Sequence, residues 1–304
     1  MSPVERRGSQ ICGLAGFVGI RDPKVRRDLV DALGAGIDPR GGHASGYVNV
    51  DRDNDTYVHA KRVGSWTFSK NKFRRRASHG DMAILHSRWA TCGNKNAQDQ
   101  AHPYAIRRNG EVKLIGAQNG QIWNAEESAK FHNRPYDVDS RELFELMADG
   151  NVEGIQDLDG YGVINWFVPG TNYISLVRLS SHSEICVCSL KQGGIAWAST
   201  WDILRDALEY AELEADYEYN ISEVGRVYHI RDSGVYRTPT TGISFDAKQL
   251  PESVPETWEK ELWAKQQEQA ELEEVYRDMM MAKWGDDKPM FDEHLYTTWE
   301  REKE

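Results

Sequence analysis

Short apolar runs separated by polar turns fill the chain up to about Lys248, a pattern typical of β-strands joined by hairpins. The strand candidates are residues 13–20, 47–50, 57–63, 82–85 and 112–115. The polar sequence DRDND separates the second candidate from the third and predicts a hairpin. Three more hairpin turns are predicted by the sequences PGTN, KQGG and RDSG, which begin at Pro169, Lys191 and Arg231.

Apolar residues at helical spacing predict helices over residues 25–33, 141–147 and 201–215. We expect the first helix to stop at Gly34, because glycine often follows the last helical residue. The second should begin at Asp139 or Ser140, whose side chains suit a helix start. Strands in antiparallel runs with helices grouped between them indicate an α+β fold rather than alternating βαβ units.

The residues after Leu250 differ in composition from the rest. The sequence PESVPE suits a linker, and residues 258–284 are rich in Glu, Lys, Gln, Ala and Met, which favours a long helix. From Gln249 to Glu304 there are 16 acidic and 7 basic residues, so −9 of the net charge of −11 lies there. Four of the ten tryptophans also lie in this tail. They indicate either packing on the chain's own domain or contact with a partner, which includes a second copy of the chain.

Composition excludes several classes of protein. No run of 18 apolar residues exists, so we expect no membrane span, and residues 1–11 lack the apolar core of a secretory signal. Four cysteines are too few for a disulfide scaffold, and their spacing does not suggest zinc, so we expect a reducing cytoplasm. Seven basic residues and no acidic residue lie between Lys61 and Arg76. A solvated loop or hairpin edge explains that run better than nucleic-acid binding does.

Candidate chemistry is concentrated in four stretches. They are residues 12–16 (CGLAG), 40–46 (RGGHASG), 86–93 (HSRWATCG) and 118–124 (QNGQIWN), with Asp139-Ser140 following. Each is weak alone, because a lone cysteine is usually a core residue and Asn-Gly is first of all a turn signal. In this order and spacing they resemble the class II glutamine amidotransferases, which belong to the N-terminal nucleophile hydrolase superfamily. The resemblance covers roughly Cys12 to Gly242, and His43 stands where the family has aspartate.

The resemblance implies a four-layer α/β/β/α sandwich of two antiparallel sheets, and it implies roles for individual residues. Cys12 would be the nucleophile, and the Asn119 side chain and the Gly120 backbone N–H would stabilise the oxyanion. Arg88 would bind the α-carboxylate of glutamine, and Asp139 would bind its α-ammonium. The remaining substrate-binding candidates are Trp89, Thr91 and Arg40. The resemblance calls for no metal and no cofactor, whereas His86 and His102 are expected to be structural and Cys92 to have no role.

The backbone nitrogen of Cys12 matters for the chemistry that this resemblance implies. A free α-amine on the nucleophile can act as its base, because the pKa of such an amine is about 8. Residues 1–11 precede Cys12 and leave its nitrogen in an amide. We therefore expect residues 1–11 to be a leader or propeptide, residues 12–248 the amidotransferase domain, and residues 249–304 a helical tail.

The function expected from the sequence is hydrolysis of glutamine with delivery of ammonia to an acceptor. Residues after Lys248 are too few for a synthetase domain, so we expect either an acceptor site on a partner protein or a stand-alone glutaminase. One alternative is a γ-glutamyl amide hydrolase with the same nucleophile. A second alternative is a catalytically silent scaffold that acts as a binding or structural protein, which the leader and His43 motivate.

Overall fold

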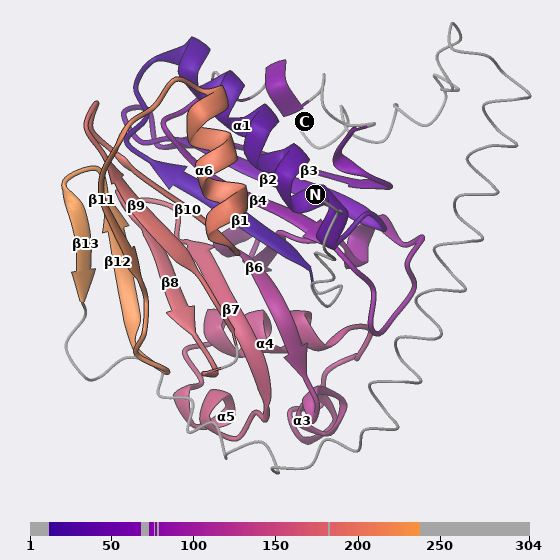
Figure 1. Cartoon of the computed structure of the whole chain (residues 1–304). Coiled ribbons are helices and arrows are strands. Elements are labelled where there is room, and N and C mark those ends of the chain that lie inside the picture. The colour runs from indigo at the N-terminus through magenta and orange to yellow at the C-terminus, as the bar shows by residue number, and fades with distance from the viewer. Residues whose placement is uncertain (1–11, 68–72, 76, 78, 182, 238–304) are drawn as a thin grey trace, which may run out of the picture. The chain divides into compact units, whose positions relative to one another are not determined.

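The computed structural model describes residues 12–67, 73–75, 77, 79–181 and 183–237 (Figure 1). The expectations for a leader at residues 1–11 and a tail at residues 249–304 lie outside this part of the chain. The described strands form two sheets, and the paired strands within each sheet run antiparallel.

The first sheet has seven strands in the order β11-β9-β10-β1-β4-β2-β3. Its strands are β1 (Gly13–Val18), β2 (Ala44–Asp51), β3 (Thr56–Val63), β4 (Met82–Arg88), β9 (Cys186–Leu190), β10 (Ile195–Ala198) and β11 (Ala215–Asn220). The second sheet has six strands in the order β13-β12-β8-β7-β6-β5. Its strands are β5 (Tyr104–Arg108), β6 (Glu111–Ile122), β7 (Gly160–Phe167), β8 (Ile174–Arg178), β12 (Val227–Arg231) and β13 (Gly234–Arg237).

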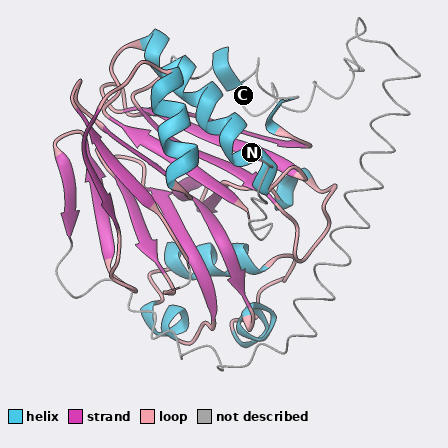
Figure 2. Ribbon diagram, viewed as in Figure 1, coloured by secondary structure: helices cyan, strands magenta, loops and turns pink. Residues whose placement is uncertain are grey.

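Helices lie outside the two sheets (Figure 2). On the first sheet these are α1 (Pro23–Ile37) and α6 (Trp201–Tyr210), and beside the second sheet they are α3 (Ala125–Phe131), α4 (Asp139–Ala148) and α5 (Val152–Gln156). Short 3-10 helices cover Asp38–Arg40 and Gln98–Gln100.

Alternation of side chains along the strands builds the layers. In β1, Phe17 belongs to the apolar cluster that includes Leu29 of α1, whereas Leu14 on the opposite face belongs to the cluster that includes Ala117 of β6. A third apolar cluster joins the outer face of the second sheet to α4 through residues such as Phe144. The expected four-layer α/β/β/α sandwich is confirmed.

Local expectations held at the turns and failed at two helix ends. The four predicted hairpins are present as β2–β3, β7–β8, β9–β10 and β12–β13. The stop at Gly34 was wrong, because α1 continues to Ile37. A Cβ on Gly34 would lie 1.9 Å from the Trp66 indole, so this glycine serves packing against Trp66. The helix predicted over residues 201–215 ends at Tyr210, and Ala215 instead begins an edge strand on β9.

Candidate functional site

The period-two alternation of the strands brings Cys12 and Asn119 to one end of the space between the sheets. Leu14 of β1 and Ala117 of β6 both belong to the core between the sheets. Cys12 precedes Leu14 by two residues and Asn119 follows Ala117 by two, so each continues the row that faces the opposite sheet. Both side chains are nearly buried, at 8% and 7% exposed.

The sulfur of Cys12 is held by the backbone of Trp89, directly after β4. The Trp89 N–H donates to Sγ at 3.2 Å, and the thiol donates to the Trp89 carbonyl oxygen at 3.4 Å. Burial raises the pKa of the Cys12 thiol to about 11, although the Trp89 bond and the Arg88 charge both act to lower it. The group is therefore a neutral thiol at pH 7, and a base must take its proton if it is to act as a nucleophile.

A small cavity opens beside this thiol. Its lining residues are Cys12, Arg88, Trp89, Thr91, Cys92, His102, Gly120, Val138, Asp139 and Ser140. Six of the eight site residues expected from the sequence therefore surround one space. The other two, Arg40 and Asn119, are not among the lining residues.

Arg88 ends β4 and is almost completely buried. Its two terminal nitrogens donate to the carbonyl oxygens of Asn94 (3.2 Å) and Cys92 (2.7 Å), so the guanidinium holds the loop that follows the strand. A guanidinium carries five N–H groups, and these two bonds leave donors for a further acceptor. Arg88 thus brings a fixed positive charge to the cavity.

Asp139 is the first residue of α4 and brings the negative charge. It does not cap the helix, because Val138 occupies the N-cap position. Its Oδ2 accepts from the Ile122 N–H at 2.8 Å, and its Oδ1 accepts from the Cys92 thiol at 3.2 Å. Cys92, for which the sequence predicted no role, thus supplies one of the donors that hold the carboxylate.

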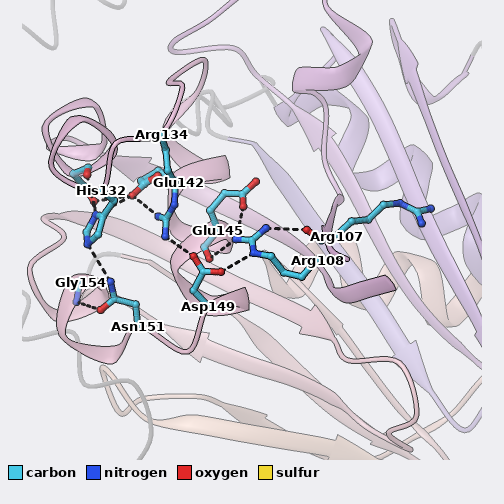
Figure 3. A network of polar contacts seen from close by, with 10 residues as sticks. Arg107, Arg108, His132, Arg134, Glu142, Glu145, Asp149, Asn151 and Gly154 are labelled. Carbon is cyan, nitrogen blue, oxygen red and sulfur yellow. Dashed lines mark hydrogen bonds and ion pairs between the residues drawn. The ribbon is translucent and has the colours of Figure 1, made fainter. Parts of the chain in front are cut away.

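Ion pairs fix the helix that carries Asp139 (Figure 3). Glu142, one turn after Asp139 and 3% exposed, accepts from Arg134 at 3.0 Å. Arg134 also pairs with Asp149 at the C-terminal end of α4, and Asp149 in turn pairs with Arg108 of β5 at 2.6 Å. The network ties α4 to the segment after α3 and to the sheet edge. It therefore holds Asp139 in position relative to β6.

Asn119 and Gly120 lie side by side in β6. The Asn119 amide donates to Ser199 Oγ at 3.2 Å, and its Oδ1 is buried without a partner among the described residues. A Cβ on Gly120 would lie 2.0 Å from the Tyr161 carbonyl oxygen, so only glycine lets β6 approach β7 this closely.

Arg40 and His43 support the cysteine from the second motif. Arg40 Nε donates to the Cys12 carbonyl oxygen at 3.5 Å, and burial lowers the pKa of this guanidinium. His43 Nδ1 accepts from the Ala90 N–H at 2.9 Å, and its ring stacks on Trp89 at 4.1 Å between centroids. The consecutive N–H groups of Trp89 and Ala90 thus hold Cys12 and His43.

His86 and His102, expected to be structural, both bind the backbone of Gln118. His86 Nε2 donates to the Gln118 carbonyl oxygen at 2.8 Å, and the Gln118 N–H donates to His102 Nδ1 at 3.1 Å. Burial lowers the pKa of His86 to about 3 and that of His102 well below its usual value, so both rings are neutral. They fix β6 at the residue before Asn119.

The solved structures that share this architecture include the following two. One is a structure of the allosteric regulatory enzyme of purine biosynthesis, at 18% identity and a TM-score of 0.58, covering 75% of this chain and 48% of that one. The other is glutamine phosphoribosylpyrophosphate amidotransferase from B. subtilis complexed with ADP and GMP, also at 18% identity and 0.58, covering 76% and 50%. These matches establish the fold. The chain spans about half the length of the structures that it matches. No protein-family model and no curated protein sequence matches the chain.

Two features of the described residues bear on other functions. No group of three or more His, Cys, Asp or Glu side chains in this part of the chain is arranged to hold a metal ion. No helix within it is both long enough and apolar enough to cross a membrane.

Sequence reasoning missed Cys92 because a single thiol in a loop carries no spacing signal, and its contact with Asp139 appears only in the folded chain.

Proposed function

We propose that this domain hydrolyses the side-chain amide of glutamine through a thioester on Cys12 and that the ammonia passes to an acceptor on a partner protein. The proposal rests chiefly on one observation, the cavity that Cys12, Arg88 and Asp139 line together. Glutamine has an α-carboxylate, an α-ammonium and a neutral side-chain amide. The guanidinium and the carboxylate suit the two charges, and the thiol suits the amide carbon.

The proposed reaction has two stages. The Cys12 sulfur adds to the amide carbon as the thiol proton passes to a base, and the oxyanion is held by the Asn119 amide and the Gly120 N–H. The base then returns the proton to the leaving nitrogen, so the C–N bond breaks and ammonia departs from a thioester. Water adds to the thioester next, and glutamate leaves with the thiol restored.

The base in this proposal is the α-amine of Cys12, freed by cleavage of the Ile11–Cys12 peptide bond. An amide nitrogen cannot accept a proton at neutral pH, whereas a free α-amine has a pKa of about 8. The buried thiol makes a base necessary, because its pKa of about 11 leaves little thiolate at pH 7. Residues 1–11 would thus be a propeptide.

Covalent labelling tests the proposal. Diazo-oxo-norleucine presents the glutamine backbone with an electrophilic side chain, so it should add one adduct per chain, at Cys12, in the protein that hydrolyses glutamine. The Cys12→Ala variant should take up no label and release no ammonia. The matched control is Cys188→Ala, because Cys188 is a buried thiol in β9 that does not line the cavity.

The substrate assay separates the alternatives. Ammonia release from glutamine supports the amidotransferase reading, and faster cleavage of a γ-glutamyl anilide would favour a γ-glutamyl amide hydrolase instead. A chain that begins at Cys12, takes up no label and cleaves neither compound would instead support a silent scaffold.

A further inference from the structure

The hydroxyl of Ser199 joins the two halves of the candidate site. Ser199 follows β10, is 2% exposed, and continues the ladder beyond the Ala15–Ala198 pair. Its Oγ accepts from the Leu14 N–H at 2.9 Å and donates to the Leu14 carbonyl oxygen at 3.1 Å. The same oxygen accepts from Asn119 Nδ2 at 3.2 Å. One donated and two accepted bonds fill the capacity of a hydroxyl.

These bonds connect the nucleophile's strand to the oxyanion residue in the other sheet. Leu14 lies two residues after Cys12, so holding both of its backbone polar groups fixes the start of β1. Asn119 belongs to β6 of the second sheet. The hydroxyl therefore sets the position of Asn119 relative to the start of β1 across the sandwich.

The amide of Asn119 depends on this contact for its orientation. Its Oδ1 is buried without a partner among the described residues, and the bond to Ser199 is the one side-chain bond that the described residues give Nδ2. A primary amide has two N–H groups, so one bond to Ser199 leaves the second for an oxyanion. Without Ser199, no side-chain hydrogen bond among the described residues would hold the amide against rotation about its terminal torsion, which is intrinsically broad.

We propose that Ser199 is a positioning residue that aims the Asn119 amide at the oxyanion formed on Cys12. This inference rests on the proposed function, and it assigns to Ser199 an effect on the transition state rather than on glutamine binding. An oxyanion donor contributes about 10²- to 10³-fold to kcat, and a donor that is present but misaligned loses part of that. Ser199→Ala should therefore lower kcat by roughly 10- to 100-fold while KM changes by less than about threefold.

A double-mutant cycle tests the inference, using the full chain in its glutamine-hydrolysing form. The four proteins are wild type, Ser199→Ala, Asn119→Ala and the double variant, each measured at saturating glutamine. If Ser199 acts through Asn119, the kcat of the double variant should lie within about twofold of the kcat of Asn119→Ala. Ser199→Thr keeps the hydroxyl and should recover most of the lost kcat.

The control is Ser175→Ala, which removes an equally buried hydroxyl (2% exposed) bonded to His229 and leaves the cavity untouched. Urea unfolding of each variant shows whether a loss of rate is a loss of fold. Multiplicative losses in the double variant, or a wild-type kcat in Ser199→Ala, would overturn the inference while the proposed function stands. Absence of glutamine hydrolysis in wild type that begins at Cys12 would overturn both.

Discussion

Single residues set the chemistry of this site through backbone contacts more than through side-chain pairs. The Cys12 sulfur is bonded to both polar backbone groups of Trp89, and the Asp139 carboxylate is bonded to the Ile122 N–H. Arg88 is held by two loop carbonyl groups. Such contacts leave the side chains in place without neutralising the two charges that would bind the proposed zwitterionic substrate.

Arg88→Lys tests the recognition of the substrate carboxylate. A lysine keeps the positive charge but cannot bind two loop carbonyl oxygens and a carboxylate with fork geometry, so KM for glutamine should rise at least about tenfold. Steady-state kinetics measures this, with Arg107→Lys as control because Arg107 donates to Gly110 at the surface. An unchanged KM would remove the assignment of the carboxylate to Arg88.

Cys92 offers a second test at this scale. Cys92→Ala removes the thiol that donates to Asp139 Oδ1. The carboxylate should then be less well positioned and bind the substrate ammonium more weakly, so KM should rise about two- to tenfold. Cys92→Ser keeps a donor and should stay closer to wild type. Equal KM values for all three proteins would show that this contact does not tune recognition.

At the scale of elements, α4 is held at both ends. Its first residue is bonded to β6, and its later turns are held by the pairs around Arg134 and Arg108 (Figure 3). Glu142 is buried within this network, and a buried charge that loses its partner is strongly destabilising. The helix therefore acts as a fixed arm for Asp139.

Arg134→Met tests whether α4 depends on these ion pairs. It leaves the Glu142 carboxylate without its guanidinium and should lower the free energy of unfolding by about 3 kcal/mol. Urea denaturation measures the loss, and Lys130→Met is the control because the Lys130–Glu126 pair on α3 is largely exposed, with side chains 72% and 58% exposed. If the two variants are equally stable, the network does not anchor α4.

At the scale of the molecule, the sequence predicted the fold class, the hairpins and most of the cavity lining. Turn chemistry is local, so sequences such as PGTN were sufficient to place hairpins. Gly34 misled because its role lies in a contact with Trp66, some 30 residues away, which no local rule contains. No local rule contains the contacts of Ser199 and Cys92 either. Their hydrogen-bond partners belong to other elements and lie beside them only in the assembled sandwich.

We expect the buried histidines to make the domain sensitive to acid. The pKa of His86 is about 3 in the folded chain against 6.5 for an ordinary histidine, so the unfolded chain binds more protons once the pH falls below about 6.5. The contribution of these histidines to the free energy of unfolding should be fully present above that pH. It should decline toward pH 3, by up to about 1.4 kcal/mol per pH unit for each such histidine. Urea unfolding at pH 7 and pH 5 measures this decline. His86→Gln should show a smaller decline than wild type, and an equal decline would contradict the assignment.

The rate of ammonia release from glutamine by a chain that begins at Cys12 tests the proposed role of its thiol and α-amine. Intact mass establishes the starting residue, and the same chain with Cys12→Ala serves as the reference. We predict that the chain with a free Cys12 α-amine releases ammonia at least about 10³ times faster than the Cys12→Ala chain and than a chain that retains residues 1–11. A folded chain that begins at Cys12 and releases ammonia no faster than its Cys12→Ala counterpart would contradict the account.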